Sequence, residues 1–448
     1  MARKYDVVVI GSGPAGRQAG VDLKKAGLSA AMIESYGFGG TCPLRGCEPK
    51  KVLVDAAFTA ARAADMRGQG IEGTLGLNWP ELMKFNRSMV DPVPEQVESR
   101  LNMQGVDTYF GQARFAGPNL IEVDGEELEG KFVVIAVGAE PLPLDFPGRE
   151  LVSSSDVFLE LKEAPRRVVF IGGGFISFEF AHVAARAGAE AVILHRSGRA
   201  LKAFDSDLAD LQVRAMRDLG VDVRLNAPLA AVTEKGGALT VRAGREGELT
   251  FETDLVVHGA GRVPALKGLN LDKAGVAYTS RGVTVNEYMQ SVSNPWVYAA
   301  GDAADFPPPL TPAATVEAAA AAHNILFGNR KKVDHSSVPS VVFTYPPLAR
   351  VGLLEEEAIK KGLKFKKIFR DTSDLTEHRR IGLKHGGFKL LLDEDGDRVL
   401  GAHILGEKAE EVINVFALAL RHGLSATQLK EMVWAYPSFI YNTRYMWT

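Results

Sequence analysis

The feature that most constrains the fold of this chain is a repeated unit of strand, glycine-rich turn, helix and strand. In its first copy, an expected strand at 5–10 leads into a turn made by Gly11, Gly13 and Gly16, and the next strand ends at Glu34. Glycines in this spacing let the backbone approach a pyrophosphate at the helix N-terminus, and the acid lies where a ribose hydroxyl would bind. We therefore predict a dinucleotide-binding unit at the N-terminus.

The second copy runs from the apolar stretch 167–171 through Gly172, Gly174 and Ser177 to a strand that ends at His195. Ser177 replaces the third glycine, which mainly permits close helix–strand packing, so a small side chain is tolerated there. Basic side chains, rather than an acid, follow this strand: Arg196, Arg199 and Lys202. Because a carboxylate would repel a 2′-phosphate and cations would hold it, we favour NADPH over NADH, with a solvated basic loop as the alternative.

Cys42 and Cys47 are the whole thiol content of the 448 residues. Two thiols cannot complete a tetrahedral zinc site, and no histidine-rich segment lies nearby, so we predict no metal site. The pair follows the first dinucleotide unit by about one βαβ length, which places it beside the bound cofactor in such a fold. In a reducing compartment, a single cysteine pair is typical of redox catalysis rather than of a structural cross-link.

Composition excludes several classes of partner. With 46% hydrophobic and 24% charged residues, the chain is long enough for two or three globular domains. Its net charge of −3 provides no basic field, so neither nucleic acid nor a membrane surface is expected as a partner. Residues 1–10 run directly into a strand, without a signal peptide, and no apolar run is long enough to span a bilayer. We predict a cytoplasmic protein.

A further segment indicates what the first nucleotide unit binds. The apolar run 297–300 ends in Gly301 and Asp302, where the acid could bind a polyol hydroxyl. Thr311, expected as an N-cap, and Pro312 then open an alanine-rich helix. The positive end of that helix would suit an anionic reduced flavin.

These motifs together resemble the pyridine nucleotide-disulfide oxidoreductase family, which includes glutathione reductase, dihydrolipoamide dehydrogenase and mercuric reductase. Besides the two glycine turns, the matching segments are Gly40-Thr41-Cys42-x4-Cys47-x-Pro49-x-Lys51, Ala136-Val-Gly138, Gly261-Arg262-x-Pro264 and Ala300-Gly301-Asp302. The resemblance covers essentially the whole chain. It implies an α/β fold with two Rossmann-like dinucleotide-binding domains and a C-terminal α+β dimerisation domain.

The resemblance also implies domain boundaries and a homodimer. The FAD-binding domain would comprise 1–148 and 272–332, the NAD(P)H-binding domain 149–271, and the interface domain 333–448. Within the last, residues 340–344, 388–392 and 399–404 are expected to form antiparallel strands, with a helix over 410–421. Asp395-Gly396 is expected to form a hairpin turn.

By the same resemblance, hydride passes from the nicotinamide to the flavin, and the flavin reduces the Cys42–Cys47 disulfide. Cys47 would face the flavin and Cys42 the substrate. Both cysteines are expected at the start of a helix, whose positive end lowers a thiol pKa. Lys51, one helical turn beyond Cys47, would touch the flavin and pair with Glu179, with a solvated lysine as the alternative.

The resemblance implies two sets of cofactor contacts. The FAD contacts are Gly11, Gly13, Gly16, Glu34, Gly40, Thr41, Lys51, Ala113, Gly138, Gly301, Asp302 and Thr311. The NADPH contacts, with NADH as the alternative nucleotide, are Gly172, Gly174, Ile176, Glu179, Arg196, Lys202 and Gly261.

The chain departs from the family near its C-terminus. Disulfide reductases of the family carry His-Pro-Thr-x-x-Glu there, and the His and Glu act from the partner subunit as an acid–base pair, whereas this chain has Tyr436-Pro437 and Tyr441. Tyrosine titrates near pKa 10, against about 6.5 for histidine, so it is a poor proton shuttle at neutral pH but can donate a hydrogen bond. We expect the machinery that protonates a leaving thiol to be absent.

Three functions are compatible with this pattern. We favour an FAD-dependent, NADPH-using oxidoreductase that reduces a small disulfide, persulfide or related sulfur substrate. In the second function the dithiol attacks an electrophile other than a disulfide, as in the coenzyme M-linked ketopropyl carboxylase, or reduces a metal ion, as in mercuric reductase. The third is a flavin-loaded redox sensor without turnover, against which the intact cysteine pair argues.

Three other polar groups are interpreted without a catalytic role. His258, at the end of an apolar strand, is expected to be a packing histidine. Glu317 is expected to be an exposed helix carboxylate as readily as a neighbour of the flavin. Residues 377–380 are expected to form a solvated turn, with a contact to an anionic substrate or partner as the alternative.

Overall fold

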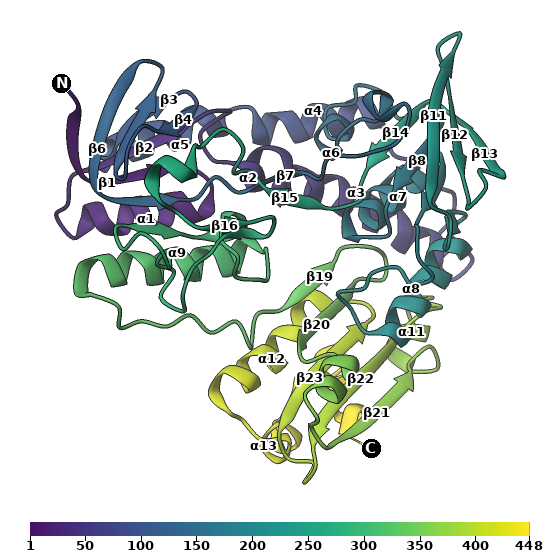
Figure 1. The fold of residues 1–448 in the computed structure, drawn as a ribbon. Coiled ribbons are helices and arrows are strands. Elements are labelled where there is room, and N and C mark those ends of the chain that lie inside the picture. The colour runs from purple at the N-terminus through teal and green to yellow at the C-terminus, as the bar shows by residue number, and fades with distance from the viewer. Residues whose placement is uncertain (448) are drawn as a thin grey trace. The chain divides into compact units, whose positions relative to one another are not determined.

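The structure, a computed structural model, describes residues Met1–Trp447. The chain forms two compact units, each assembled from segments that are distant in the sequence (Figure 1). The first unit comprises Met1–Lys50, Phe85–Leu142 and Arg262–His335. The second comprises Lys51–Lys84, Pro143–Gly261 and the chain from Ser336 onward.

The first unit is built on a seven-stranded sheet in the order β3-β2-β1-β6-β5-β4, with β18 paired to β6. β1 (Arg3–Ile10) is parallel to both β2 (Ala30–Glu34) and β6 (Glu126–Ile135). The valines at 7–9 have no exposed surface, as expected of a parallel strand covered on both faces. α1 (Pro14–Lys25) and α9 (Thr311–Phe327) pack against each other on one side of this sheet (Figure 1).

The first unit also contains two further helices, short strands and 3-10 turns. They are α2 (Thr41–Arg45), α5 (Val93–Met103), β3 (Asp107–Phe110), β4 (Ala113–Phe115), β5 (Leu120–Val123), β7 (Ala139–Pro141), β15 (Arg262–Pro264), η2 (Leu271–Ala274), β16 (Tyr278–Thr279), β17 (Gly282–Val283), β18 (Val297–Ala299) and η3 (Gly301–Ala303). Two helices continue from one unit into the other, α3 (Cys47–Asp65) and α4 (Trp79–Val90).

The second unit holds three sheets (Figure 1). A parallel sheet has the order β10-β9-β8-β14, and an antiparallel sheet has the order β11-β12-β13. Their elements are η1 (Arg149–Leu151), α6 (Ser155–Phe158), β8 (Arg167–Ile171), α7 (Phe175–Arg186), β9 (Glu190–Leu194), α8 (Ser206–Asp218), β10 (Asp222–Arg224), β11 (Leu229–Lys235), β12 (Ala238–Ala243), β13 (Leu249–Thr253) and β14 (Leu255–His258).

The third sheet is antiparallel, in the order β19-β20-β23-β22-β21, and α12 contacts two of its strands, β20 and β23. The elements of this region are β19 (Ser340–Val342), β20 (Leu348–Gly352), α10 (Glu355–Lys360), β21 (Phe365–Asp371), α11 (Thr376–Arg379), β22 (Gly387–Asp393), β23 (Val399–Leu405), α12 (Ala409–His422), α13 (Ala426–Glu431) and η4 (Ile440–Trp447). The three predicted strands and the predicted helix are therefore confirmed. Gly423, at φ +66°, ends the helix.

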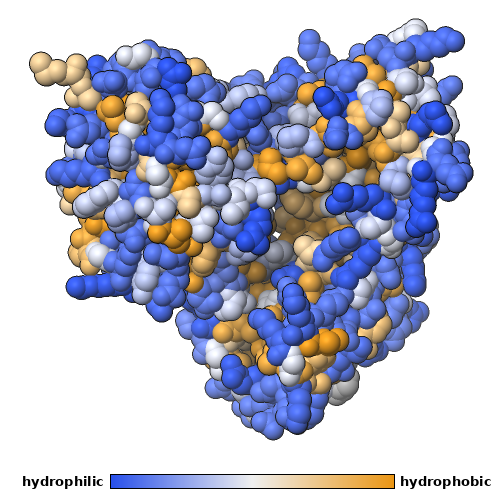
Figure 2. Space-filling model, in the orientation of Figure 1, coloured by the Kyte–Doolittle hydropathy of each residue, from blue (hydrophilic) through white to orange (hydrophobic). Residues whose placement is uncertain are grey.

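Both predicted dinucleotide units are confirmed as elements. β1, α1 and β2 follow one another as strand, helix and parallel strand, and β8, α7 and β9 repeat the arrangement in the second unit. Hydrophilic side chains cover most of the face in Figure 2, with apolar residues in small groups. Among the described residues, every helix is too short or too polar to cross a bilayer.

Candidate active site

The first glycine turn is formed by close approach of backbone segments. Gly11 has φ +103°, and a Cβ there would lie 2.3 Å from the carbonyl oxygen of Ala136. A Cβ on Gly16 would lie 1.8 Å from the carbonyl oxygen of Gly11. Gly13 is the N-cap of α1 and provides no side-chain acceptor for the N–H groups of the first helical turn. These N–H groups and the positive helix end fit a pyrophosphate.

Glu34 connects this turn to the loop before the cysteines. Its Oε2 accepts hydrogen bonds from the N–H and hydroxyl of Ser12, at 3.0 and 2.6 Å, and its Oε1 accepts from the N–H groups of Ser35 and Tyr36, at 2.9 Å each. The Ser12 hydroxyl accepts a further bond from the Gly39 N–H at 2.9 Å. Sequence reasoning missed Ser12, although a serine inside the glycine turn, opposite a strand-end acid, is a signal for such a bond.

The two cysteines lie in contact at the start of α2 and α3. Cys42, in α2, is half-buried, and Cys47 is the exposed first residue of α3; neither is in a disulfide. The pKa of the Cys42 thiol is raised, first by its contact with Cys47 and then by burial, while a hydrogen bond with Thr311 opposes the shift. The Cys47 Sγ lies 3.7 Å from Oγ1 of Thr311. Two sulfur atoms in contact can interconvert between dithiol and disulfide.

Two expectations are wrong at this place. A lowered pKa is expected for both thiols at helix starts, but at Cys42 the contact with Cys47 and burial raise the pKa instead. For Cys47 the expectation stays a prediction. Thr311 was expected to cap α9, but it is the first residue within α9, and Leu310 occupies the N-cap position. The Thr311 hydroxyl is therefore placed against the cysteine sulfurs.

The glycine-flanked strand end Gly301-Asp302 also lies in the first unit. Gly301 has φ +69°, and its N–H donates to Oε2 of Glu317 at 2.7 Å. Burial raises the pKa of Asp302, and Arg262 opposes that shift. Glu317 is 1% exposed, so its predicted exposure is wrong: α9 turns this carboxylate towards the Gly301 turn rather than towards solvent.

Three further predicted FAD contacts, Gly40, Ala113 and Gly138, also lie in the first unit. Gly40 has φ +73°, and a Cβ there would lie 2.5 Å from Cα of Gly13. Gly138 follows β6 at φ +70° with open space where a Cβ would be, and Ala113 is buried at the start of β4. Arg17, which sequence reasoning missed, has a buried Nε without a hydrogen-bond partner among the described residues. An anion-binding turn, a buried strand-end carboxylate and a guanidinium whose Nε has no partner among the described residues together fit FAD.

Lys51 and Glu179 belong to the second unit, where Phe343 contacts both. The Lys51 Nζ lies 5.0 Å from the centroid of the Phe343 ring, and the Phe343 N–H donates to Oε1 of Glu179 at 2.8 Å. Glu179 is 2% exposed on α7. The described ion pair of Lys51 is with Asp55, at 2.5 Å. A pair between Lys51 and Glu179 stays a prediction.

The second glycine turn repeats the geometry of the first. Gly172 has φ +106°, and a Cβ there would lie 2.4 Å from the carbonyl oxygen of Gly259. Gly174 is the N-cap of α7 and brings no side chain. Ser177 is fully buried, and its Oγ lies 2.1 Å from the place that a Cβ on Gly259 would take. Ile176 is half-buried on α7, and Gly261 has open space at φ +122°. This turn fits a second pyrophosphate.

His195, which follows β9, is hydrogen-bonded to this turn. Its Nδ1 accepts the Gly173 N–H at 3.0 Å, and its Nε2 lies 2.9 Å from the carbonyl oxygen of Arg199. Because Nδ1 accepts an N–H, it carries no proton, and Nε2 is left to donate to the Arg199 carbonyl. Burial lowers the pKa of His195, in keeping with this neutral ring. The Arg199 guanidinium is bound to Glu356 and to the carbonyl oxygen of Phe204. Arg199 is therefore already engaged within the second unit.

The two C-terminal tyrosines contact each other. The ring centroids of Tyr436 and Tyr441 are 4.8 Å apart, with the planes at 65°. Tyr436 is 72% exposed. Arg444, which sequence reasoning missed, donates a hydrogen bond to the Tyr441 hydroxyl, whose own proton is left to an acceptor. This pair of phenols can donate hydrogen bonds but holds no carboxylate or imidazole.

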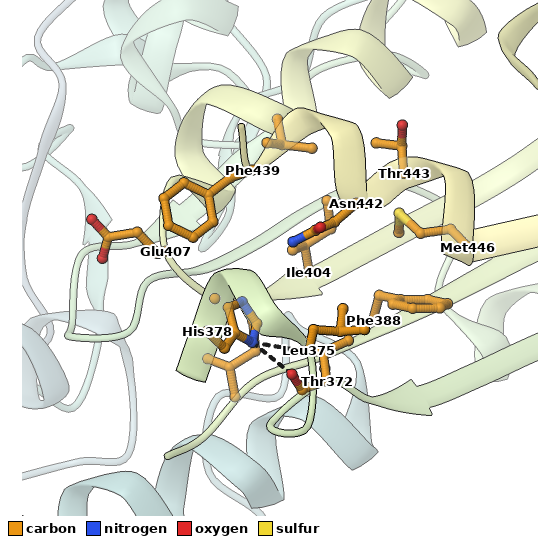
Figure 3. Close-up of a pocket in the computed structure, with 14 residues that line it drawn as sticks. Thr372, Leu375, His378, Phe388, Ile404, Glu407, Phe439, Asn442, Thr443 and Met446 are labelled. Atoms are coloured by element: carbon orange, nitrogen blue, oxygen red, sulfur yellow. Dashed lines mark hydrogen bonds between the residues drawn. The ribbon is translucent and has the colours of Figure 1, made fainter. Parts of the chain in front are cut away.

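A cavity of about 40 Å³ lies beneath η4 in the second unit (Figure 3). His378 faces it, and its Nδ1 lies 2.9 Å from the carbonyl oxygen of Thr372. None of the predicted site residues lines this cavity. The solvated turn expected at 377–380 is wrong in part, because Glu377 and His378 are buried in α11. His258 is buried and accepts the Ala260 N–H, as expected of a packing histidine.

Two nucleotide turns and a contacting thiol pair on an α/β framework define a two-nucleotide oxidoreductase. Residues 5–322 match the model of pyridine nucleotide-disulphide oxidoreductases, and residues 338–444 match the dimerisation domain of the same group. The chain belongs to the pyridine nucleotide-disulphide oxidoreductase family, whose members are flavoprotein enzymes that use FAD and a pyridine nucleotide. The expected two Rossmann-like domains and α+β dimerisation domain are confirmed.

Several characterised proteins are similar over nearly their whole length. A dihydrolipoyl dehydrogenase from Thermus scotoductus is 34% identical over 444 residues, 97% of this chain and 95% of its own. A glutathione reductase from Burkholderia cepacia is 32% identical over 434 residues, 93% of this chain and 92% of its own. The Cu(II) complex of RclA, an HOCl-induced flavoprotein disulfide reductase from Escherichia coli, superposes with a TM-score of 0.89 at 27% identity, covering 99% of both chains.

Proposed function

We propose that this enzyme takes electrons from NADPH through FAD into the Cys42–Cys47 pair and passes them to a small disulfide, persulfide or related sulfur compound. The observation that carries this proposal is the contact between the two thiols beside Thr311 in a unit whose turn fits FAD. The matched dimerisation domain supports a homodimer. We also propose the cytoplasm as its location.

FAD, when bound, accepts a hydride and returns two electrons. In the proposed cycle these electrons reduce the Cys42–Cys47 disulfide to a dithiol. The Cys42 sulfur attacks one sulfur of the substrate disulfide, forming a mixed disulfide and releasing the other half as a thiolate. Cys47 then attacks the Cys42 sulfur, which re-forms the enzyme disulfide and releases the second thiolate. The two protons of the enzyme dithiol pass through water to the two released thiolates, so each turnover consumes one hydride, one further proton and one disulfide and yields two thiols.

The residues proposed to hold the flavin are those predicted from the sequence. The first-turn N–H groups after Gly13 would bind the pyrophosphate, Glu34 and Asp302 would bind ribose and polyol hydroxyls, and the start of α9 at Thr311 would face the reduced ring. Lys51 and Glu179 are proposed to act at the flavin as a pair. The domains proposed are 1–148 with 272–332 for FAD, 149–271 for the nicotinamide nucleotide and 333–448 for the subunit interface.

NADPH is favoured because Arg196 and Lys202 follow β9 where an acid would serve NADH. Arg199 supports this role less, because it is bound to Glu356. We expect Arg196→Ala and Lys202→Ala each to raise the KM for NADPH by about tenfold, the loss of one charge-assisted bond, with little change for NADH. Arg199→Ala is the matched control. Equal effects on the two nucleotides would remove the argument for a 2′-phosphate site.

Metal-ion reduction is the second candidate. The Cu(II) complex of RclA and a mercuric reductase from Staphylococcus aureus, 31% identical over 436 residues, are both similar to this chain. Tyr436 and Tyr441 favour an acceptor that needs no protonated leaving group. Among the described residues, three or more metal-binding side chains do not gather at any point, so the dithiol itself would have to receive the ion.

An acceptor screen separates the two candidates. Purified enzyme is mixed with NADPH and, in turn, with glutathione disulfide, inorganic polysulfide, Cu(II) or Hg(II), and the oxidation of NADPH is followed. The proposal predicts the highest kcat/KM on a sulfur acceptor and its loss in Cys42→Ser. Turnover confined to metal ions would support the second candidate, and sulfur reduction that persists in Cys42→Ser would exclude Cys42 as the exchanging thiol.

A further inference from the structure

The Gly301-Asp302 turn rests on a pair of buried groups. The Glu317 side chain is 1% exposed and the His335 side chain is 9% exposed, and the Glu317 Oε1 lies 3.1 Å from Nε2 of His335. The other carboxylate oxygen of Glu317 accepts the Gly301 N–H at 2.7 Å. One carboxylate therefore joins the flavin-side turn to a histidine at the end of the first unit.

The second ring nitrogen of His335 also faces an acceptor. Its Nδ1 lies 2.9 Å from the carbonyl oxygen of Pro307, and the ring stands edge-on to Phe306 with centroids 5.1 Å apart. A neutral imidazole carries one N–H and cannot donate to both Pro307 and Glu317. With Glu317 ionised, the imidazolium suits both neighbours and forms an ion pair with Glu317 that is shielded from water, although Nε2 faces the carboxylate without the alignment of a hydrogen bond.

The turn itself has little freedom to move. Gly301 has φ +69°, and a Cβ there would lie 3.2 Å from Cβ of Ala314 on α9 and 3.3 Å from Cβ of Ala15 on α1. α1 is the helix whose N-terminus is proposed to hold the pyrophosphate. A shift of Gly301 would therefore disturb the carboxylate of Asp302 and the packing beside the pyrophosphate helix.

We propose that Glu317 and His335 are positioning residues for FAD: their buried ion pair holds the Gly301 N–H and thereby sets the place of Asp302. This role rests on the proposed function, in which Asp302 binds the flavin polyol. Neither residue is proposed to touch FAD. The pair is distinct from the cysteine chemistry and acts through the backbone.

The charges around the pair set a direction of pH dependence. Burial would lower the pKa of His335, but Glu317, the Pro307 carbonyl and the charge of Asp334 outweigh burial and raise it. Glu317 in turn raises the pKa of Asp302, and Arg262 lowers it. A raised histidine pKa means that the stabilisation is complete at low pH and is lost as pH rises through that pKa. Neutral His335 would leave Glu317 and Asp302 as neighbouring carboxylates, with Arg262 acting on Asp302.

Binding of FAD to the apoprotein, followed by quenching of flavin fluorescence, tests the proposal. We expect Glu317→Gln and His335→Gln each to raise the FAD dissociation constant by at least tenfold. The double variant should have a dissociation constant no higher than that of either single variant. The wild-type constant should rise with pH between about 6.5 and 9, and this rise should vanish in His335→Gln. His323→Gln on the same helix is the matched control and should bind as the wild type does.

The possible outcomes distinguish failure of the ion-pair proposal from failure of the proposed function. Wild-type affinity in both variants, or additive losses in the double variant, would overturn the ion pair while leaving FAD binding intact. A wild-type chain that binds no FAD would instead overturn the proposed function, and the positioning role with it. If a variant fails to fold, as judged by circular dichroism, the pH dependence of the wild type decides: a flat profile would overturn the proposal.

Discussion

Replacing Tyr436 with histidine should restore part of the acid–base chemistry that the family uses on disulfides. Tyr436 is 72% exposed, so Tyr436→His removes only an edge-on ring contact with Tyr441 and should change the free energy of unfolding by about 1 kcal/mol or less. At such an exposed position the new histidine would keep an ordinary pKa of about 6.5. Any change in activity would then reflect proton transfer rather than folding.

The expected gain follows from acid strength. A leaving thiol has a pKa of about 8.5, so a phenol near 10 protonates it uphill and an imidazolium near 6.5 protonates it downhill. With a Brønsted coefficient of about 0.5, this difference is worth roughly 60-fold when the histidine is fully protonated. About one histidine in ten is protonated at pH 7.5, which leaves a gain of about sixfold, and half are protonated at pH 6.5, which leaves about thirtyfold.

Steady-state turnover of glutathione disulfide with NADPH at several pH values measures this gain. Tyr445→His, on the same segment but outside the aligned pair, is the matched control and should show no gain. The reasoning would be refuted by Tyr436→His that reduces glutathione disulfide no faster than the wild type at pH 6.5 while its flavin is still reduced by NADPH at the normal rate.

Three further predictions concern stability and cofactor binding. Lys389→Met, which strands a fully buried Asp205 beside two other carboxylates, should lower the free energy of unfolding by about 3–5 kcal/mol in urea, whereas exposed Lys364→Met should change it by less than about 0.5 kcal/mol. Gly11→Ala should yield protein without FAD, seen as loss of the flavin absorbance, because its Cβ would lie 2.3 Å from a carbonyl oxygen. Burial lowers the pKa of His182 and of His403 to about 3, so the unfolded chain binds more protons than the folded chain below pH 6.5. As the pH falls from 6 to 4, each residue should therefore lower the free energy of unfolding by about 1 kcal/mol per pH unit, measured by urea titration. A free energy of unfolding that does not change over this range would contradict their burial.

Local patterns were sufficient for the framework. Gly11 and Gly172 stand in turns where positive φ and close backbone approach leave room for no other residue, and continuous apolar runs such as 7–10 form strand segments covered on both faces. These features depend on neighbours in the sequence and on regular periodicity. They can therefore be inferred from one chain.

The burial and pKa of single side chains were harder to infer, because they depend on segments that are distant in the sequence. The burial of Glu317 follows from the turn at Gly301 and from His335, neither of which is near it in sequence. The raised pKa of Cys42 follows from its contact with Cys47 and from burial, against the helix-end effect that the sequence suggests. His378 is buried beside Thr372, Gly406 and Phe439, which lie apart from one another in the sequence, so no local pattern indicates its burial (Figure 3).

The central claim is that electrons from NADPH reach the Cys42–Cys47 pair through the flavin. Anaerobic titration of the holoenzyme with NADPH, followed by visible absorbance, tests it most directly. The account predicts a long-wavelength thiolate–flavin charge-transfer band in the wild type and its disappearance in Cys47→Ser. A wild-type spectrum without that band, or a band that is unchanged in Cys47→Ser, would contradict the account.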